Sequence, residues 1–270
     1  MKIVRLVAAL VLALAGLFAA AGPAHATGDA TVSVLHGIPG ATVDVYANGS
    51  ELLKNFTPGT LTAPMMIPAG TYDLKVVAAG AGKNGAAIVE AKGVTVPANA
   101  NITVVAHLSA DGKPMLTPFV NDTSPSAKGA RLTVRHVAAA PAVDVRANAS
   151  VVFSDLTNPN EAKADVAAMS VSADVVLHGT STVAIGPADL TIKAGMNTIV
   201  YAWGSAADKN LKLAVQTVAL QGAPMPATGD HGPIATVSTG PSNSYLYLSG
   251  GLLLLAALAL GSRRLIRERA

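Results

Sequence analysis

The sequence predicts an all-β protein built from two tandem β-sandwich domains. The stretch Val43–Ser50 (Val-Asp-Val-Tyr-Ala-Asn-Gly-Ser) returns a hundred positions later as Val143–Ser150 (Val-Asp-Val-Arg-Ala-Asn-Ala-Ser), and a histidine stands eight residues before the aspartate of each copy. We interpret this as the duplication of one unit of about ninety residues. Short alternating runs separated by turn signals recur through both copies, which is typical of antiparallel sheet.

The strands of the first copy are expected at the alternating runs. Thr31–His36 places Val32, Val34 and His36 on one face, and Thr42–Tyr46 leads into an Asn48-Gly49 pair that favours a type I′ hairpin turn. Further runs are Thr71–Ala78, Ala87–Val96 (one or two strands), Ile102–Leu108 and Met115–Val120. Seven or so strands at this spacing predict a small sandwich.

The domain boundaries follow from the repeat and from composition. We expect domain 1 at residues 27–122, a short linker at 123–130 and domain 2 at 131–220. Residues 221–244 are rich in Pro, Gly, Ser and Thr, which predicts an extended, mobile stalk.

The N-terminal segment 1–26 has the pattern of a secretory signal peptide. Lys2 and Arg5 precede an apolar run, and Ala24 and Ala26 form a small-x-small cleavage site that would leave Thr27 as the first mature residue. The alternative is an uncleaved anchor helix. The signal peptide predicts an exported protein.

The C-terminal segment combines an apolar run with positive charge. Residues 245–262 are just long enough for a transmembrane helix, and the basic tail 263–270 would hold the C-terminus in the cytoplasm. A packed soluble helix is the alternative. We therefore expect a single-pass type I membrane protein with both domains outside the cell.

A five-residue motif stands before this run: Met225, Pro226, Ala227, Thr228 and Gly229. The order of pentapeptide, apolar span and basic tail resembles the cell-wall sorting signal of Gram-positive surface proteins. That resemblance implies cleavage by a sortase between Thr228 and Gly229 and attachment of Thr228 to peptidoglycan. The usual first residue is Leu, where this chain has Met225. The alternative is that the motif is only part of the stalk.

Charge and cysteine content exclude several classes of partner and site. The chain has 19 basic and 16 acidic residues. Setting aside the two basic residues of the signal peptide, and the four arginines and one glutamate of the tail, leaves 13 basic and 15 acidic residues. The exported part therefore carries no excess positive charge for nucleic-acid binding. Without cysteine, disulfides, thiolate nucleophiles and Cys-ligated zinc are excluded.

The opening of each copy, a strand ending in His, a Pro-containing turn and then Val-Asp-Val, resembles the bacterial secreted family called domain of unknown function 4397. The turn Pro68–Tyr72 and the strand after Ala98 fit the same resemblance, which covers Thr31 to Leu220. It implies tandem immunoglobulin- or transthyretin-like sandwiches on secreted or surface-attached proteins, and it implies no activity. The chain departs from the usual pattern after His36 and at Arg146, where an aromatic residue is usual.

His36 with Asp44, and His136 with Asp144, are the candidate binding residues, because these polar residues recur in both copies. One hypothesis is a His–Asp pair on neighbouring strands that takes part in a ligand or metal site. The other is structural: the aspartate accepts N–H bonds from a turn, and the histidine bridges strands. Metal binding needs at least three converging ligands, so we assign no metal or cofactor.

No pattern of an enzyme is present in the sequence. There is no Gly-x-Ser-x-Gly nucleophile elbow and no Gly-rich phosphate loop, so we assign no catalytic residue. We expect a non-enzymatic cell-surface protein in a structural, adhesive or interaction role, with an unknown protein or glycan as its ligand. A small-ligand or metal-binding receptor that uses the His/Asp positions is the alternative.

Overall fold

The computed structural model describes residues 28–222 and 236–237. The predicted signal peptide, the Met225–Gly229 motif, the apolar run 245–262 and the basic tail lie outside these residues. In the described residues no helix is present that could span a membrane. All the regular structure described is β-strand, arranged in four sheets, as the fold class predicted from sequence requires.

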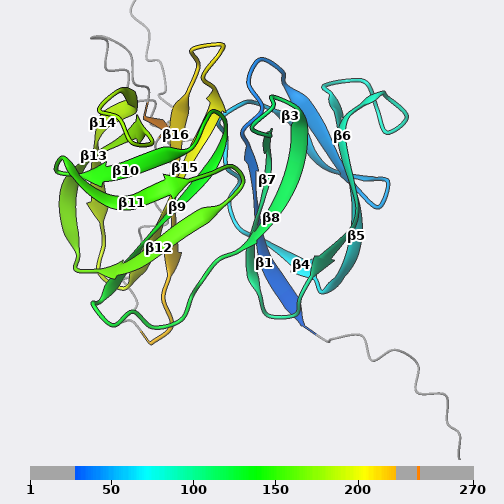
Figure 1. The fold of residues 1–270 in the computed structure, drawn as a ribbon. Coiled ribbons are helices and arrows are strands. Elements are labelled where there is room, and N and C mark those ends of the chain that lie inside the picture. Colours follow the sequence, from blue (N-terminus) through cyan, green and yellow to red (C-terminus); the bar gives the residue numbers. More distant parts are fainter. Residues whose placement is uncertain (1–27, 223–235, 238–270) are drawn as a thin grey trace, which may run out of the picture.

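Domain 1 is formed by eight strands (Figure 1). They pair as two sheets in the orders β4–β1–β7–β8 and β3–β2–β5–β6. The bounds are β1 (Asp29–His36), β2 (Val43–Ala47), β3 (Ser50–Phe56), β4 (Met65–Pro68), β5 (Gly70–Ala78), β6 (Ala87–Val96), β7 (Asn101–Leu108) and β8 (Pro114–Val120).

Domain 2 has the same strand order. Its sheets are β12–β9–β15–β16–β17 and β11–β10–β13–β14, so that β9 to β16 follow the plan of β1 to β8. The bounds are β9 (Ala130–Ala139), β10 (Val143–Ala147), β11 (Ser150–Leu156), β12 (Glu161–Val166), β13 (Met169–Leu177), β14 (Val183–Ile192), β15 (Met196–Ser205), β16 (Lys212–Ala219) and β17 (Thr236–Val237).

One strand pair in each domain is parallel, and here the prediction of antiparallel sheet is wrong. β1 runs parallel to β7, and β9 runs parallel to β15. Alternation of apolar and polar residues reports which face is buried but carries no information on strand direction. The relative direction of these strands follows from the chain path, which brings the first and seventh strands of each domain side by side in one sheet.

The predicted hairpin turn between β2 and β3 is confirmed. Asn48 and Gly49 both have positive φ, as a type I′ turn requires. The matching turn in domain 2 uses Asn148 and Ala149, with φ values of 49° and 64°. The short strand β4 was missed from sequence, because Met65–Pro68 has four residues, one of them proline. The predicted stalk also contains β17, which pairs with β16.

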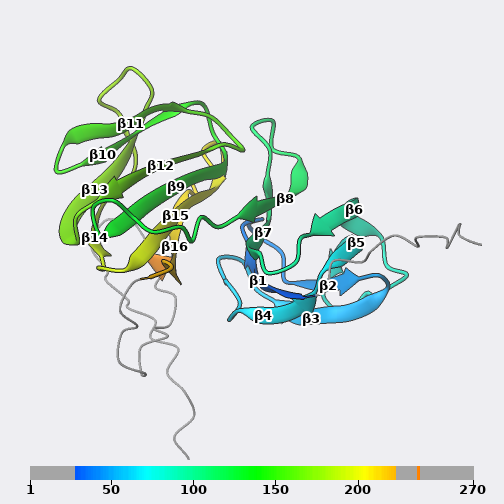
Figure 2. The ribbon, with the colours of Figure 1, turned by 90° about the horizontal axis from the view of Figure 1, so that it is seen from below.

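Each sandwich has its own apolar core, and a further apolar cluster joins the two domains. In domain 1 the core contains Val34, Val45 and Val104, and in domain 2 it contains Val134 and Val145. The third cluster draws from both domains, so β1, β7, β9 and β15 are buried on both faces. These are the facing central strands of the two domains in Figure 1 and Figure 2.

Candidate functional site

His36 is enclosed at the end of β1 and braces the turn that follows it. Its Nε2 lies 2.8 Å from the carbonyl oxygen of Ala41, and the backbone N–H of Ile38 donates to its Nδ1 at 3.3 Å. This pattern requires Nε2 to carry the proton. Burial lowers the pKa of His36, so the neutral ring is the native form.

His136 repeats this arrangement in domain 2. Its Nε2 lies 2.9 Å from the carbonyl oxygen of Pro141, and the N–H of Ala138 lies 3.4 Å from its Nδ1. Burial lowers the pKa of this ring as well. The two repeated histidines therefore hold equivalent turns through backbone contacts.

Asp44 joins three segments of domain 1. One carboxylate oxygen accepts the N–H of Asn55 at 2.8 Å, and the other accepts the N–H of Gly80 at 2.8 Å. These two bonds, the Asn55 bond first, hold the pKa of Asp44 below its ordinary value. The carboxylate ties β2 to the irregular end of β3 and to the turn after β5.

The hypothesis of a His–Asp pair on neighbouring strands is contradicted by the strand pairing. His36 lies on β1 and Asp44 on β2, and these strands belong to different sheets of the sandwich. The same separation holds for His136 and Asp144. The chain crosses from one sheet to the other in the turn between them. Within residues 28–222, no three His or acidic side chains gather as metal ligands.

Asp144 has a histidine partner that sequence reasoning missed. His178, in the turn after β13, lies with Nδ1 2.8 Å from Asp144 Oδ1, and nearly half of its side chain is exposed. The N–H groups of Asp155 and Gly179 and the hydroxyl of Ser154 also donate to Asp144. The His178 contact comes first among the causes that lower the pKa of Asp144, and it raises the pKa of His178. The structurally matching residue in domain 1 is Ala79, so this pair is not part of the repeat.

The chemistry available to His178 is limited. A carboxylate that orients an imidazole forms two thirds of a nucleophile-activating triad. In the described residues no hydroxyl is hydrogen-bonded to His178 Nε2. The contact with Asp144 becomes an ion pair when the imidazole of His178 is protonated.

The larger feature is the seam between the domains, formed by the sheet β4–β1–β7–β8 and the sheet β12–β9–β15–β16–β17. Ten buried residues make its apolar cluster: Leu35, Leu61, Val105 and Phe119 from domain 1, and Val137, Ile199, Tyr201, Trp203, Ala214 and Val218 from domain 2. Because this cluster faces away from both sandwich cores, it buries surface that either domain alone would expose to water.

Arg135 lies at the centre of the seam with only 1% of its side chain exposed. Its guanidinium contacts Glu161 at 2.8 Å, Asn121 Oδ1 at 2.8 Å and the hydroxyl of Tyr201 at 2.7 Å. It also lies 4.5 Å from the ring centroid of Phe119. Asn121 and Phe119 belong to the end of domain 1, so one side chain of domain 2 is bound by groups of both domains.

Neutral hydrogen bonds continue across the seam. The hydroxyl of Thr103 donates to Gln216 Oε1 at 2.9 Å, and Gln216 also accepts from Tyr201 at 2.6 Å. The side-chain amide of Asn158 donates both to the carbonyl of Leu108 in domain 1, at 2.8 Å, and to the carbonyl of Ala138 in domain 2, at 2.6 Å. These contacts fix the position of one domain relative to the other.

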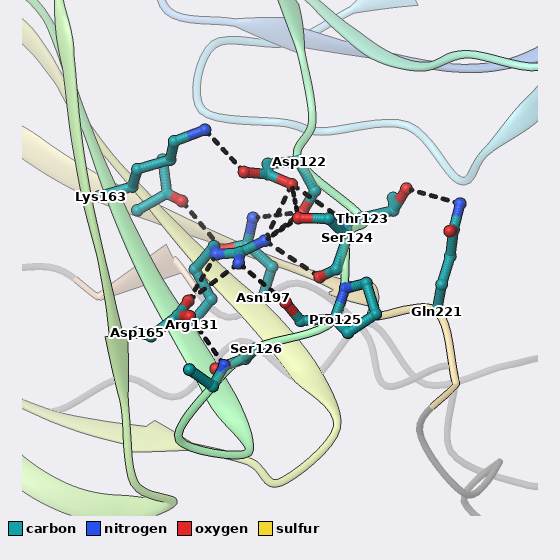
Figure 3. Close-up of polar contacts among 12 residues, drawn as sticks. Asp122, Thr123, Ser124, Pro125, Ser126, Arg131, Lys163, Asp165, Asn197 and Gln221 are labelled. Atoms are coloured by element: carbon teal, nitrogen blue, oxygen red, sulfur yellow. Dashed lines mark hydrogen bonds and ion pairs between the residues drawn. The ribbon is translucent and has the colours of Figure 1, made fainter.

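The segment between the domains is bound to domain 2 along its length (Figure 3). Arg131 contacts Asp122 and Asp165, each at 2.9 Å, and donates to the carbonyl of Ser124. Lys163 Nζ lies 2.6 Å from Asp122, and this contact is the first cause of the lowered pKa of Asp122. The segment predicted as a linker therefore has defined partners.

The seam was predictable only in part. The runs Ile102–Leu108 and Ile199–Trp203 are almost continuously apolar, which is a signal of strands buried on both faces. In addition, positions facing each sandwich core keep similar residues in the two copies, as in Val34 and Val134. Seam positions differ instead, with Leu35 in the place of Arg135. The face of one domain therefore complements the different face of the other.

Acid is expected to destabilise the two-domain body through its buried histidines. His107 is enclosed on β7 between Leu108 O and Thr117, and burial lowers its pKa to about 4, with a smaller contribution from His136. An unfolded His titrates near 6.5, so the unfolded chain binds more protons as the pH falls from about 6.5 to about 4. His107 alone would reduce the free energy of unfolding by roughly 3 kcal/mol across this window.

Urea unfolding at a series of pH values measures this effect. His107→Gln should flatten the loss of stability between pH 6.5 and 4. His178→Ala is the control with the opposite expected effect. The pKa of His178 is raised in the folded protein, so this residue stabilises the fold below the pKa of an unfolded histidine. Its removal should therefore steepen the loss of stability in acid. An unchanged slope in His107→Gln would contradict the assignment.

The described fold and contacts define an all-β protein of two sandwich domains joined by a buried seam. Residues 30–146 match the family model of a domain of unknown function (DUF4397). The matched region covers domain 1 and reaches into β10. No curated protein is significantly similar to the chain.

Proposed function

We propose that this is a non-enzymatic cell-surface protein that displays two β-sandwich domains as one rigid body, in a structural, adhesive or interaction role. The seam is the observation that supports it best. An apolar cluster, the buried Arg135 and the bound linker segment all act against independent motion of the domains. A rigid body suits a part that presents a fixed surface to an unknown protein or glycan.

The family and the chain ends support the remaining parts of the proposal. We propose that domain 2 is a second copy of the matched family domain, because its strand order repeats that of domain 1. Export by the signal peptide 1–26 and anchoring by residues 245–262 would make it a single-pass type I membrane protein with the domains outside the cell. The His/Asp positions support a receptor role less well, since their polar atoms are used within the protein.

A distance measurement between spin labels tests the rigid body. The chain contains no cysteine, so Met66→Cys in domain 1 and Met169→Cys in domain 2 would give a specific pair at exposed positions. We expect one narrow distance distribution. The pair Met66→Cys and Val120→Cys, both in domain 1, supplies the reference width. A distribution several times broader between domains than within domain 1 would contradict the proposal.

Cell fractionation tests the location and the mode of attachment. The proposed membrane anchor predicts an intact wild-type chain in the membrane fraction of a Gram-positive host. The sortase alternative predicts a chain in the wall fraction that ends at Thr228 and carries peptidoglycan. Thr228→Ala should then move the protein to the membrane fraction. Wild-type protein found only in the membrane would mean that Met225–Gly229 is part of the stalk and is not cleaved by a sortase. Wild-type protein retained in the cytoplasm would overturn the proposed surface role.

A further inference from the structure

The geometry points to a binding site inside domain 1 for a small uncharged hydrocarbon, such as an aromatic ring or the end of an aliphatic chain. A cavity of about 170 Å³ lies between the two sheets of this domain. All eight strands of domain 1 contribute to its lining. This inference is independent of the surface role proposed above.

The size of the cavity identifies the size of its occupant. Protein interiors pack to the density of organic crystals, with few voids larger than a water molecule. An apolar cavity of about 150 Å³ stays dry and binds benzene or xenon. An unfilled cavity lowers the stability of a protein in proportion to its volume. A ligand of roughly six to ten heavy atoms would supply the contacts that the side chains lining the cavity lack.

The lining determines the chemical class of the ligand. Every lining side chain is aliphatic or aromatic hydrocarbon except His36 and Tyr72. The nitrogens of His36 are bonded to Ala41 and Ile38, and the hydroxyl of Tyr72 donates to the carbonyl of Pro68 at 2.8 Å. With these polar atoms engaged, a charged or strongly polar ligand would lose its hydration without compensation. The site therefore fits an uncharged hydrocarbon.

The edges of the sandwich indicate the route of entry. β6 and β8 pack against each other along one side of domain 1. On the other side, β3 and β4 are the edge strands of the two sheets, as Figure 2 shows. Leu52 on β3 and Ile67 on β4 line the cavity, and both remain partly exposed. A ligand is therefore expected to enter between these two edges.

Domain 2 provides an internal comparison. Its corresponding cavity measures about 40 Å³. Leu132 and Leu190 line it at the positions that Val32 and Val94 occupy in domain 1. Leu132 and Leu190 each add one methylene group relative to domain 1, whereas Val171 and Ala173 are smaller than the matching Tyr72 and Leu74. We therefore place the site in domain 1, which has the larger of the two cavities.

Methyl NMR on residues 27–244, which contain both sandwiches and β17, tests the proposal with xenon and toluene as probes. We expect saturable shifts of the Val45, Val76 and Val104 methyl groups. Toluene at about ten times its dissociation constant should also raise the melting temperature by roughly 3 °C or more. Val32→Leu combined with Val94→Leu should weaken toluene binding at least tenfold without lowering the melting temperature.

Val183→Leu, an exposed site in domain 2, is the matched control and should bind toluene as the wild type does. If the variant with both Val32→Leu and Val94→Leu fails to fold, the methyl shifts of the wild type still show whether toluene binds in the cavity. Shifts that are absent at saturating toluene, or confined to seam methyls such as those of Val105 and Ile199, would overturn the inference.

Discussion

Replacing Arg135 with alanine is expected to lower the free energy of unfolding by about 3 kcal/mol or more, because the change removes a side chain that is only 1% exposed and takes a hydrogen bond from two buried groups. The change removes a guanidinium that contacts Glu161, Asn121, Tyr201 and the ring of Phe119. It leaves an acceptor on Asn121 and the hydroxyl of Tyr201 short of a partner in the seam. Urea denaturation of the wild type and variant measures the difference.

Arg146→Ala is the matched control for this prediction. Arg146 makes a bidentate contact with Asp174 at 2.7 and 2.6 Å, but both side chains are partly exposed and lie outside the seam. Water can replace this contact, so its loss should cost much less. Equal decreases in the free energy of unfolding for the two arginine variants would show that Arg135 does not stabilise the protein more than an arginine outside the seam.

Leu35→Ala, a change in domain 1, is expected to lower the unfolding midpoint that Trp203 reports from domain 2. Leu35 is fully buried in the interdomain cluster, and truncating such a leucine costs about 2 to 5 kcal/mol. Trp203 is the single tryptophan of the chain and belongs to the same cluster. Its fluorescence and the circular dichroism of the whole body should therefore share one midpoint, shifted downward together.

Met66→Ala serves as the control, because Met66 is 63% exposed in the same domain. It should leave both signals near their wild-type midpoints. A circular dichroism transition that separates into two steps, with the Trp203 step unmoved by Leu35→Ala, would mean that the domains unfold independently. That result would also remove the main support for a rigid displayed body.

The candidate residues show what a repeat in sequence can and cannot indicate. Recurrence of His36 and Asp44 as His136 and Asp144 correctly marked polar positions with one role in both copies. It carried no information on whether the two side chains meet. The histidine partner of Asp144 is His178, which occupies the position of Ala79 in the first copy, so recurrence could not reveal this contact.

The sequence by itself determined the all-β class, most of the strands and the Asn48-Gly49 turn, because these depend on local alternation and on the backbone freedom of single residues. Only the tertiary structure decided the parallel pairing of β1 with β7, the seam around Arg135 and the cavity in domain 1. Each of these depends on surfaces from distant segments. Alternation shows that Leu35 and Val34 point to opposite faces, but which face meets a neighbour is settled by packing between whole sheets.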